Sequence, residues 1–281
     1  MAGVSTKEIK TRIRSMESTK QITKAMEMVA ASKLRKAQSQ VSAARPYFQI
    51  LYDTIARIVQ TNTDFSSAYL MQRPVKKICY IVIAGDRGLA GGYNSNLFKL
   101  VSARIEGSDV TVLPIGKKTL DHFRAHKIPT LTENYAHCEL VTLGDCFTMA
   151  KSICKRFLSG EFDQVFIAYT RCVSVLSQDP AALQLLPLKP EEGLQKAGTG
   201  ADILYEPDSV SVFETIVPEY LGGIVYGALC ESRASEQAAR RTAMDAATQN
   251  ADEMIADLSL QFNRARQASI TQEITEIVAG S

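Results

Sequence analysis

The sequence predicts an α/β fold in which two long terminal helices flank a mostly parallel sheet covered by shorter helices. Small and apolar side chains recur at helical spacing near both ends of the chain, from about Ser5 to Gln60 and from about Val210 to Val278. Between these segments, short β-rich runs alternate with helical runs, which is typical of a parallel sheet covered by helices. The 281 residues suffice for one large domain together with an extended element.

The N-terminal helix is expected in a stretch that contains no glycine and a single proline. Ser5 and Glu8 have the spacing of a capping box. Small and apolar residues then recur with a mean spacing of about 3.6 residues, the period of a helix. They are Met26, Ala30, Leu34, Ala37, Val41 and Ala44. Because proline lacks a backbone N–H, we expect Pro46 to kink or break the helix near Arg45.

The middle of the chain, about Pro74 to Pro190, carries the strand and helix alternation. The expected strands are Ile78–Ile83, Val110–Ile115, Gln164–Tyr169 and Leu183–Leu188. The expected helices are Asn94–Ile105, Lys117–His126 and Leu143–Leu158. We therefore expect four segments: a helix over 1–60, an α/β domain over 74–190, a linker over 191–208 and a helix over 209–281.

The C-terminal helix is expected to begin its long continuous stretch near Pro218, since proline is tolerated in a first turn. Three glycines follow at 222, 223 and 227, and each costs about 1 kcal/mol relative to alanine, so we expect close packing there. Farther on, apolar residues recur with a mean spacing of about 3.5 residues, which predicts a left-handed coiled coil. They are Met244, Ala247, Ala251, Met254, Leu258, Phe262 and Ala265.

Helix length gives the first functional expectation. The last helix would run roughly 90 Å at ~1.5 Å per residue, far more than a small domain covers. It must therefore pair with the N-terminal helix, and such a pair exposes apolar surface unless partners enclose it. The final turns carry Ile270, Ile274, Ile277 and Val278, an apolar tip that we expect to be enclosed.

Bulk properties exclude several classes of protein. The sequence contains no run of ~18 apolar residues, so no transmembrane helix is expected. The first residues lack the apolar core of a signal peptide. The six cysteines form no CxxC pair, which favours buried free thiols, and the three histidines do not favour a metal site. No Ser/His/Asp or Cys/His set indicates catalysis. The net charge is +2, but residues 1–45 carry ten Lys and Arg against three Glu.

The loop AGDRGLAGGYNSN, at 84–96, invites comparison with phosphate-binding loops because it follows an apolar strand and precedes a helix. Its glycines at 85, 88, 91 and 92 match neither GxxxxGK[ST] nor GxGxxG. A tight turn is the favoured interpretation, with Asp86 and Arg87 as a polar clamp or a partner contact. A nucleotide-binding enzyme with helical oligomerisation arms is the alternative.

Charged side chains on the terminal helices admit two interpretations. The basic N-terminal face could bind nucleic-acid phosphate, but no aromatic residues lie between its charges, which favours solvent or an acidic protein partner. Arg240, Arg264, Arg266 and Gln267 flank the C-terminal apolar positions. They are either solvated flanks of a coiled coil or docking points for a surrounding partner.

Three motifs carry a resemblance that covers nearly the whole chain. ITKAMEMVAASKLRKAQ, GDRGLAGGYN and ESRASEQAARRTAMDAATQNA with NRARQASITQEITEIV resemble the gamma subunits of F-type ATP synthases, in the family's order. The resemblance implies an antiparallel coiled coil of the terminal helices and a Rossmann-like base domain. It also implies a non-catalytic, cofactor-free rotating shaft at the cytoplasmic face of a bacterial inner membrane. Its partners would be the hexamer of alpha and beta subunits, the epsilon subunit and the c ring, with no nucleic acid and no membrane insertion.

The resemblance also implies roles for particular residues. Met26, Arg240, Arg264, Arg266 and Gln267 would contact the alpha and beta subunits. In the motif LYEPD, Tyr205 and Glu206 would contact the polar loops of the c ring. Ala90 stands where many relatives carry cysteine, and no close cysteine pair lies between Leu188 and Glu231, so no thiol regulation is expected.

Overall fold

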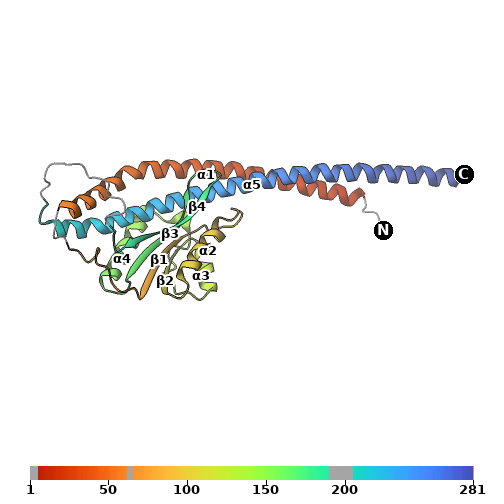
Figure 1. Ribbon diagram of the computed structural model, residues 1–281. Coiled ribbons are helices and arrows are strands. Elements are labelled where there is room, and N and C mark those ends of the chain that lie inside the picture. The colour runs from red at the N-terminus through yellow and green to blue at the C-terminus, as the bar shows by residue number, and fades with distance from the viewer. Residues whose placement is uncertain (1–5, 62–65, 190–204, 281) are drawn as a thin grey trace. The chain divides into compact units, whose positions relative to one another are not determined.

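The computed structural model describes residues 6–61, 66–189 and 205–280, and the chain forms two compact units. The coiled-coil unit comprises Met1–Ser32 with Arg240–Ser281, and the sheet unit comprises Lys33–Ala239. Two long helices, α1 (Thr6–Thr61) and α5 (Ser209–Ala279), each contribute to both units (Figure 1). The expected domain boundaries stay a prediction.

Both long helices pass through a proline. α1 continues without a break across Pro46, and α5 begins nine residues before Pro218, so the expected start near Pro218 was wrong. Asp208 explains the earlier start, because one of its carboxylate oxygens accepts a hydrogen bond of 2.8 Å from the Ser211 backbone N–H. Buried apolar side chains on both sides of the proline then hold the helix together; they are Phe213, Val217 and Leu221.

The sheet has four strands in the order β2-β1-β3-β4. Their bounds are Lys77–Ile83 for β1, Asp109–Ile115 for β2, Gln164–Cys172 for β3 and Gln178–Leu186 for β4. β1 pairs in parallel with β2 and β3, and β4 pairs antiparallel with β3. The expectation of a mostly parallel sheet is confirmed. β4 begins five residues earlier than expected because it forms a hairpin with β3.

Helices cover both faces of the sheet (Figure 1). α2 (Tyr93–Ile105), α3 (Lys117–Ala125) and α4 (Leu143–Leu158) lie within one residue of their expected bounds. Alternate residues of β1 belong to different cores: Ile81 packs with α4 and α5, whereas Val82 packs with α2 and α3. Successive side chains of β1 therefore pack against helices on opposite faces of the sheet, as the two-residue period of a strand requires.

Two glycines of α5, Gly222 and Gly227, differ in how closely they are packed. At Gly222, an added Cβ would lie closest to the Phe147 ring and 3.1 Å from the Phe147 Cα, so α4 and α5 touch there. At Gly227, an added Cβ would meet nothing within 4 Å. The expectation of close packing is confirmed for Gly222 and wrong for Gly227.

Candidate functional surfaces

The coiled-coil unit is an antiparallel helix pair. Lys20 of α1 forms an ion pair of 2.5 Å with Asp252 of α5, and Thr23 contacts Thr248, so numbers rise on one helix as they fall on the other. The less exposed positions of α5 are spaced by alternating steps of four and three residues, the spacing of a heptad. They are Met244, Thr248, Ala251, Ile255, Leu258, Phe262 and Ala265. We call this row the seam, together with the matching row of α1, which consists of Ile9, Ile13, Met16, Lys20, Thr23, Glu27 and Ala30.

The predicted coiled-coil period is therefore confirmed, but the predicted row of residues was partly wrong. Met254 was expected in the seam, yet it is 50% exposed. Thr248, which was not expected there, is 8% exposed. The apolar pattern in the sequence does not include Thr248, because its side chain is polar.

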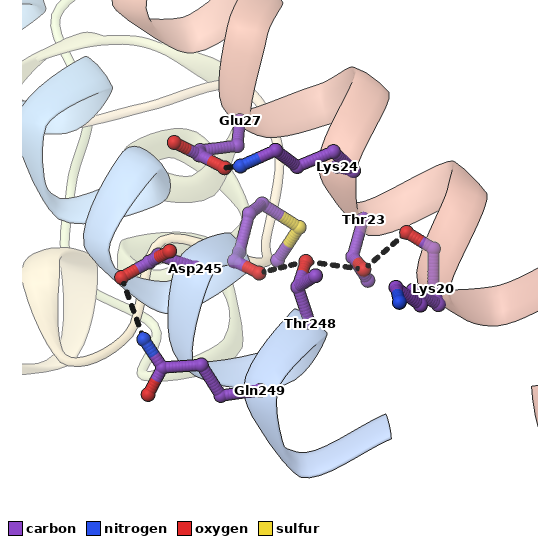
Figure 2. A network of polar contacts seen from close by, with 8 residues as sticks. Lys20, Thr23, Lys24, Glu27, Asp245, Thr248 and Gln249 are labelled. Carbon is purple, nitrogen blue, oxygen red and sulfur yellow. Dashed lines mark hydrogen bonds and ion pairs between the residues drawn. The ribbon is translucent and has the colours of Figure 1, made fainter. Parts of the chain in front are cut away.

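Two threonines meet inside the seam. Figure 2 shows Thr23 of α1 and Thr248 of α5 pointing toward each other. Their hydroxyl oxygens are 2.7 Å apart, the usual length of an O–H···O hydrogen bond. Each hydroxyl also lies within bonding distance of a carbonyl of its own helix, Lys20 O at 3.1 Å and Met244 O at 2.8 Å.

The predicted contact residue on α1 has apolar neighbours. Met26 is half-buried, at the border of the seam. Ile22, Met28 and Val29 are 57–60% exposed, so large apolar side chains also occur on α1 outside the seam. None of these three residues is predicted as a contact from the sequence. Their signal was a set of large apolar side chains outside the helical repeat.

The predicted contact residues on α5 lie in two places. Arg240 is half-buried, whereas Arg264, Arg266 and Gln267 are exposed. The register of the two threonines places Thr6, the first described residue of α1, opposite Ala265. From Arg266 to Ala279 every residue of α5 is exposed.

This exposed C-terminal stretch of α5, residues 266–279, is the tip. Its large apolar side chains are Ile270, Ile274, Ile277 and Val278, and they are 47–72% exposed. Fourteen helical residues extend over roughly 21 Å. The tip therefore presents apolar surface that the described part of α1 does not cover.

Tyr205 and Glu206 precede α5 and differ in how far their side chains are buried. Tyr205 packs against the main core, and its hydroxyl is buried with no hydrogen-bond partner among the described residues. Glu206 is exposed. Of the two residues expected to contact a ring, Glu206 is thus the one whose side chain is open to solvent.

In the sheet unit, α5 fills the crevice at the carboxyl ends of the parallel strands. The Ser232 hydroxyl donates to the Ile83 carbonyl at 3.2 Å, and the Ser235 hydroxyl donates to the Thr170 carbonyl at 2.9 Å. The Tyr93 hydroxyl donates to the Ser232 carbonyl at 3.0 Å. In open α/β sheets this crevice is where ligands bind. Here a helix of the same chain occupies it.

The glycine-rich loop closes the same crevice. Asp86 is a polar clamp, as one interpretation predicted: one carboxylate oxygen accepts from the backbone N–H groups of Lys117 at 3.0 Å and Cys138 at 2.9 Å. The buried Glu236 lies so close to Gly85 that an added Cβ would be 2.7 Å from its carboxylate oxygen. The loop therefore packs against α5, which counts against the nucleotide-binding alternative.

The described residues give little support for a metal site, a reactive cysteine or a membrane-spanning helix. Within residues 6–61, 66–189 and 205–280, no group of three or more His, Cys, Asp and Glu side chains could hold a metal ion. All six cysteines are free thiols, five of them buried, and burial raises the pKa of Cys79 and Cys138 to about 12. In the same described ranges, no helix is both long enough and apolar enough to traverse a bilayer.

Together, these features define a class of protein that packs against partners: an α/β unit whose ligand crevice is closed by its own helix, and a helix pair with an apolar tip. Comparison with known proteins identifies the family. A family model described as ATP synthase matches residues 5–281. A protein from Ruminococcus albus named ATP synthase gamma chain is 43% identical, over 98% of this chain and 97% of that one.

Two further relatives agree. A protein from Acetobacterium woodii named ATP synthase gamma chain, sodium ion specific, is 41% identical, over 98% of this chain and 97% of that one. A solved structure of the Tetrahymena thermophila mitochondrial ATP synthase central stalk and c ring contains a chain that is 25% identical, with a TM-score of 0.58. The match covers 80% of this chain and 99% of that one. This chain belongs to the ATP synthase gamma chains.

Proposed function

We propose that this protein is the central rotating shaft of an F-type ATP synthase and carries no catalytic site itself. Ion flow would turn the c ring, and the shaft would turn with it inside the hexamer of alpha and beta subunits. The observation that carries this proposal is the tip, whose exposed apolar side chains need an enclosing partner. Family membership supports the same role.

Coupling would arise from the asymmetry of the helix pair. At the tip, only α5 is present among the described residues, whereas from Met244 to Ala265 of α5 both helices present side chains. Each beta subunit would therefore face a different surface as the shaft turns. A contact that binds one conformation of a catalytic site better than another shifts that site toward it.

Particular residues would make these contacts. Met26, with its exposed apolar neighbours on α1, and Arg240 would face the beta subunits near the start of the shared coiled coil. Arg264, Arg266 and Gln267, exposed at the base of the tip, would dock onto the hexamer. Glu206 would contact the polar loops of the c ring, while Tyr205 anchors that segment to the core.

The remaining partners and the location follow from the same role. The sheet unit would rest on the c ring together with the epsilon subunit, and the protein would be peripheral, at the cytoplasmic face of a bacterial inner membrane. We propose H⁺ as the coupling ion. ATP synthesis driven separately by an H⁺ gradient and by an Na⁺ gradient tests that choice, because relatives with and without a sodium description are nearly equally similar to this chain.

The first test is reconstitution. Matched alpha and beta subunits are assayed for steady ATP hydrolysis with and without this chain, and we expect a stable complex with raised turnover. Failure to assemble with matched subunits would overturn the proposed role. Tight ATP binding by the isolated chain would revive the nucleotide-binding alternative, and salt-sensitive binding to duplex DNA would revive the nucleic-acid one.

The contact residues are tested in the assembled complex. Arg240→Ala and Gln267→Ala should lower ATP synthesis while leaving the chain folded. Gln249→Ala is the matched control, since Gln249 is exposed on α5 and bonds to Asp245 of its own helix. Unchanged synthesis in both contact variants would remove these two residues from the contact set.

A further inference from the structure

The seam alone specifies the register of the helix pair weakly. Many of its members are small or simply apolar, such as Ala30 and Ala251. A slide of one heptad in one direction would still pair apolar residues, with Ile255 opposite Ile9 and Ala251 opposite Ile13. A slide in either direction would, however, place Thr248 opposite Met16 or Ala30, where no hydroxyl is present. The Thr23–Thr248 contact is therefore lost when either helix slides by one heptad.

Counting the hydroxyl protons of Thr23 and Thr248 shows that a hydrogen bond must join the two helices. The two hydroxyls have two protons for three close contacts, namely the Thr23–Thr248 contact and the contacts to the Lys20 and Met244 carbonyls. If both protons pointed at their own helices, two oxygens would face each other at 2.7 Å without a proton between them. At least one proton therefore joins α1 to α5, and the other hydroxyl bonds its own carbonyl.

Charged neighbours reinforce this register less strongly. Lys20 pairs with Asp252 across the helices at 2.5 Å, but both side chains are 43–51% exposed, so solvent screens the attraction. Lys24 bonds to Glu27 of its own helix at 2.8 Å (Figure 2). The buried hydroxyl pair is less screened, because each threonine is only 8% exposed.

We propose that Thr23 and Thr248 form a register lock and thereby act as positioning residues for torque transmission, an inference that rests on the proposed shaft function. Twisting a two-helix coil drives its helices to slide along each other in opposite directions. A slip of one heptad would move the tip by roughly 10 Å relative to α1. The lock opposes this slip because sliding leaves both buried hydroxyls without their partner across the seam.

The decisive variant is the double substitution Thr23→Val with Thr248→Val. Valine has nearly the shape of threonine, so the seam stays filled, and replacing both hydroxyls leaves no unpaired polar group. The complex should assemble, and its melting temperature should be unchanged or higher. Ions pumped per ATP hydrolysed should nevertheless fall roughly twofold or more, since the exposed Lys20–Asp252 ion pair opposes sliding less strongly than the buried hydroxyl pair.

Two companion variants separate the lock from a merely structural role. Thr23→Ser with Thr248→Ser retains both hydroxyls and should retain pumping per ATP. Thr19→Val is the matched control, because Thr19 is exposed on the same helix and bonds to the Ser15 carbonyl of that helix, at 3.0 Å. It should leave pumping unchanged.

Register is measured directly by disulfide trapping in the assembled complex. Met16→Cys with Ile255→Cys places thiols at facing seam positions, whereas Met16→Cys with Phe262→Cys is one heptad out of register, roughly 10 Å too far for a disulfide. With native threonines only the first pair should close. In the valine background we expect roughly three- to tenfold more closure of the shifted pair during turnover.

The outcomes distinguish this inference from the proposed function. If the valine variant pumps normally and the shifted pair stays open, the lock is refuted while the shaft function stands. If the serine variant loses pumping as the valine variant does, a hydroxyl bond is not the cause and the lock is likewise refuted. If the unmodified chain neither assembles nor couples, the proposed function itself fails.

Discussion

Replacing Gly222 by alanine tests how tightly α4 and α5 are packed. The added methyl would lie closest to Cδ1 of Phe147, 2.9 Å from its Cε1 and 3.1 Å from its Cα. The ring can rotate, but the Cα belongs to the backbone of α4. The methyl therefore cannot be accommodated by a side-chain movement alone.

Two opposed effects set the size of the change. Alanine in place of glycine stabilises a helix interior by about 1 kcal/mol. Overpacking a filled core costs about 1–3 kcal/mol. Gly227→Ala, five residues along the same helix, gains the first effect without the second, since an added Cβ there meets nothing within 4 Å. The difference between the two variants therefore isolates the clash, at about 1–3 kcal/mol.

The assay is thermal unfolding of the full-length chain, followed by circular dichroism, for both variants side by side. A difference of about 1–3 kcal/mol corresponds to roughly 2–12 °C in melting temperature for a chain of this size. We expect Gly222→Ala to melt below Gly227→Ala by that amount. Equal melting temperatures would refute the close contact between α4 and α5.

Four further predictions follow from contacts and burial in the sheet unit. Thr142→Ala should destabilise the chain by about 1 kcal/mol in urea unfolding, because it removes the cap of α4. The Thr142 hydroxyl and backbone N–H lower the pKa of Asp145, so its stabilisation should be present above about pH 4 and lost as pH falls further. Asp145→Asn should flatten that pH dependence; an unchanged acid profile would contradict it. Tyr93→Phe should cost about 1–2 kcal/mol, since its hydroxyl bonds to Ser232 inside the crevice. A thiol reagent at pH 8 should modify Cys172 first, the one cysteine that is not fully buried; rapid reaction of several thiols would contradict the core packing.

Periodicity and turn chemistry predicted the elements of the sheet unit well. α2, α3 and α4 and the three parallel strands are short, strongly patterned segments, so local sequence suffices to locate them. The start of α5 was missed because proline preference is local, whereas burial of Phe213 and Val217 on either side of Pro218 depends on the folded core. The hairpin that extends β4 likewise depends on pairing with β3.

Prediction was less complete for the functional surfaces. The sequence indicated the coiled-coil period, but its apolar pattern includes the exposed Met254 and leaves out the buried Thr248. A polar residue inside a heptad is recognised only when its partner on the other helix is known, and Thr23 is 225 positions away. The closed crevice was also missed, because Ser232 and Ser235 look like ordinary helix residues until the sheet ends beneath them.

The central claim is that this chain rotates within an assembly of alpha and beta subunits. The most direct test fixes that assembly to a surface and attaches a visible probe to the chain through Glu106→Cys, an exposed position after α2. On addition of ATP, we expect the probe to turn in one direction for many revolutions. ATP hydrolysis by an assembly whose probe stays stationary would contradict the account.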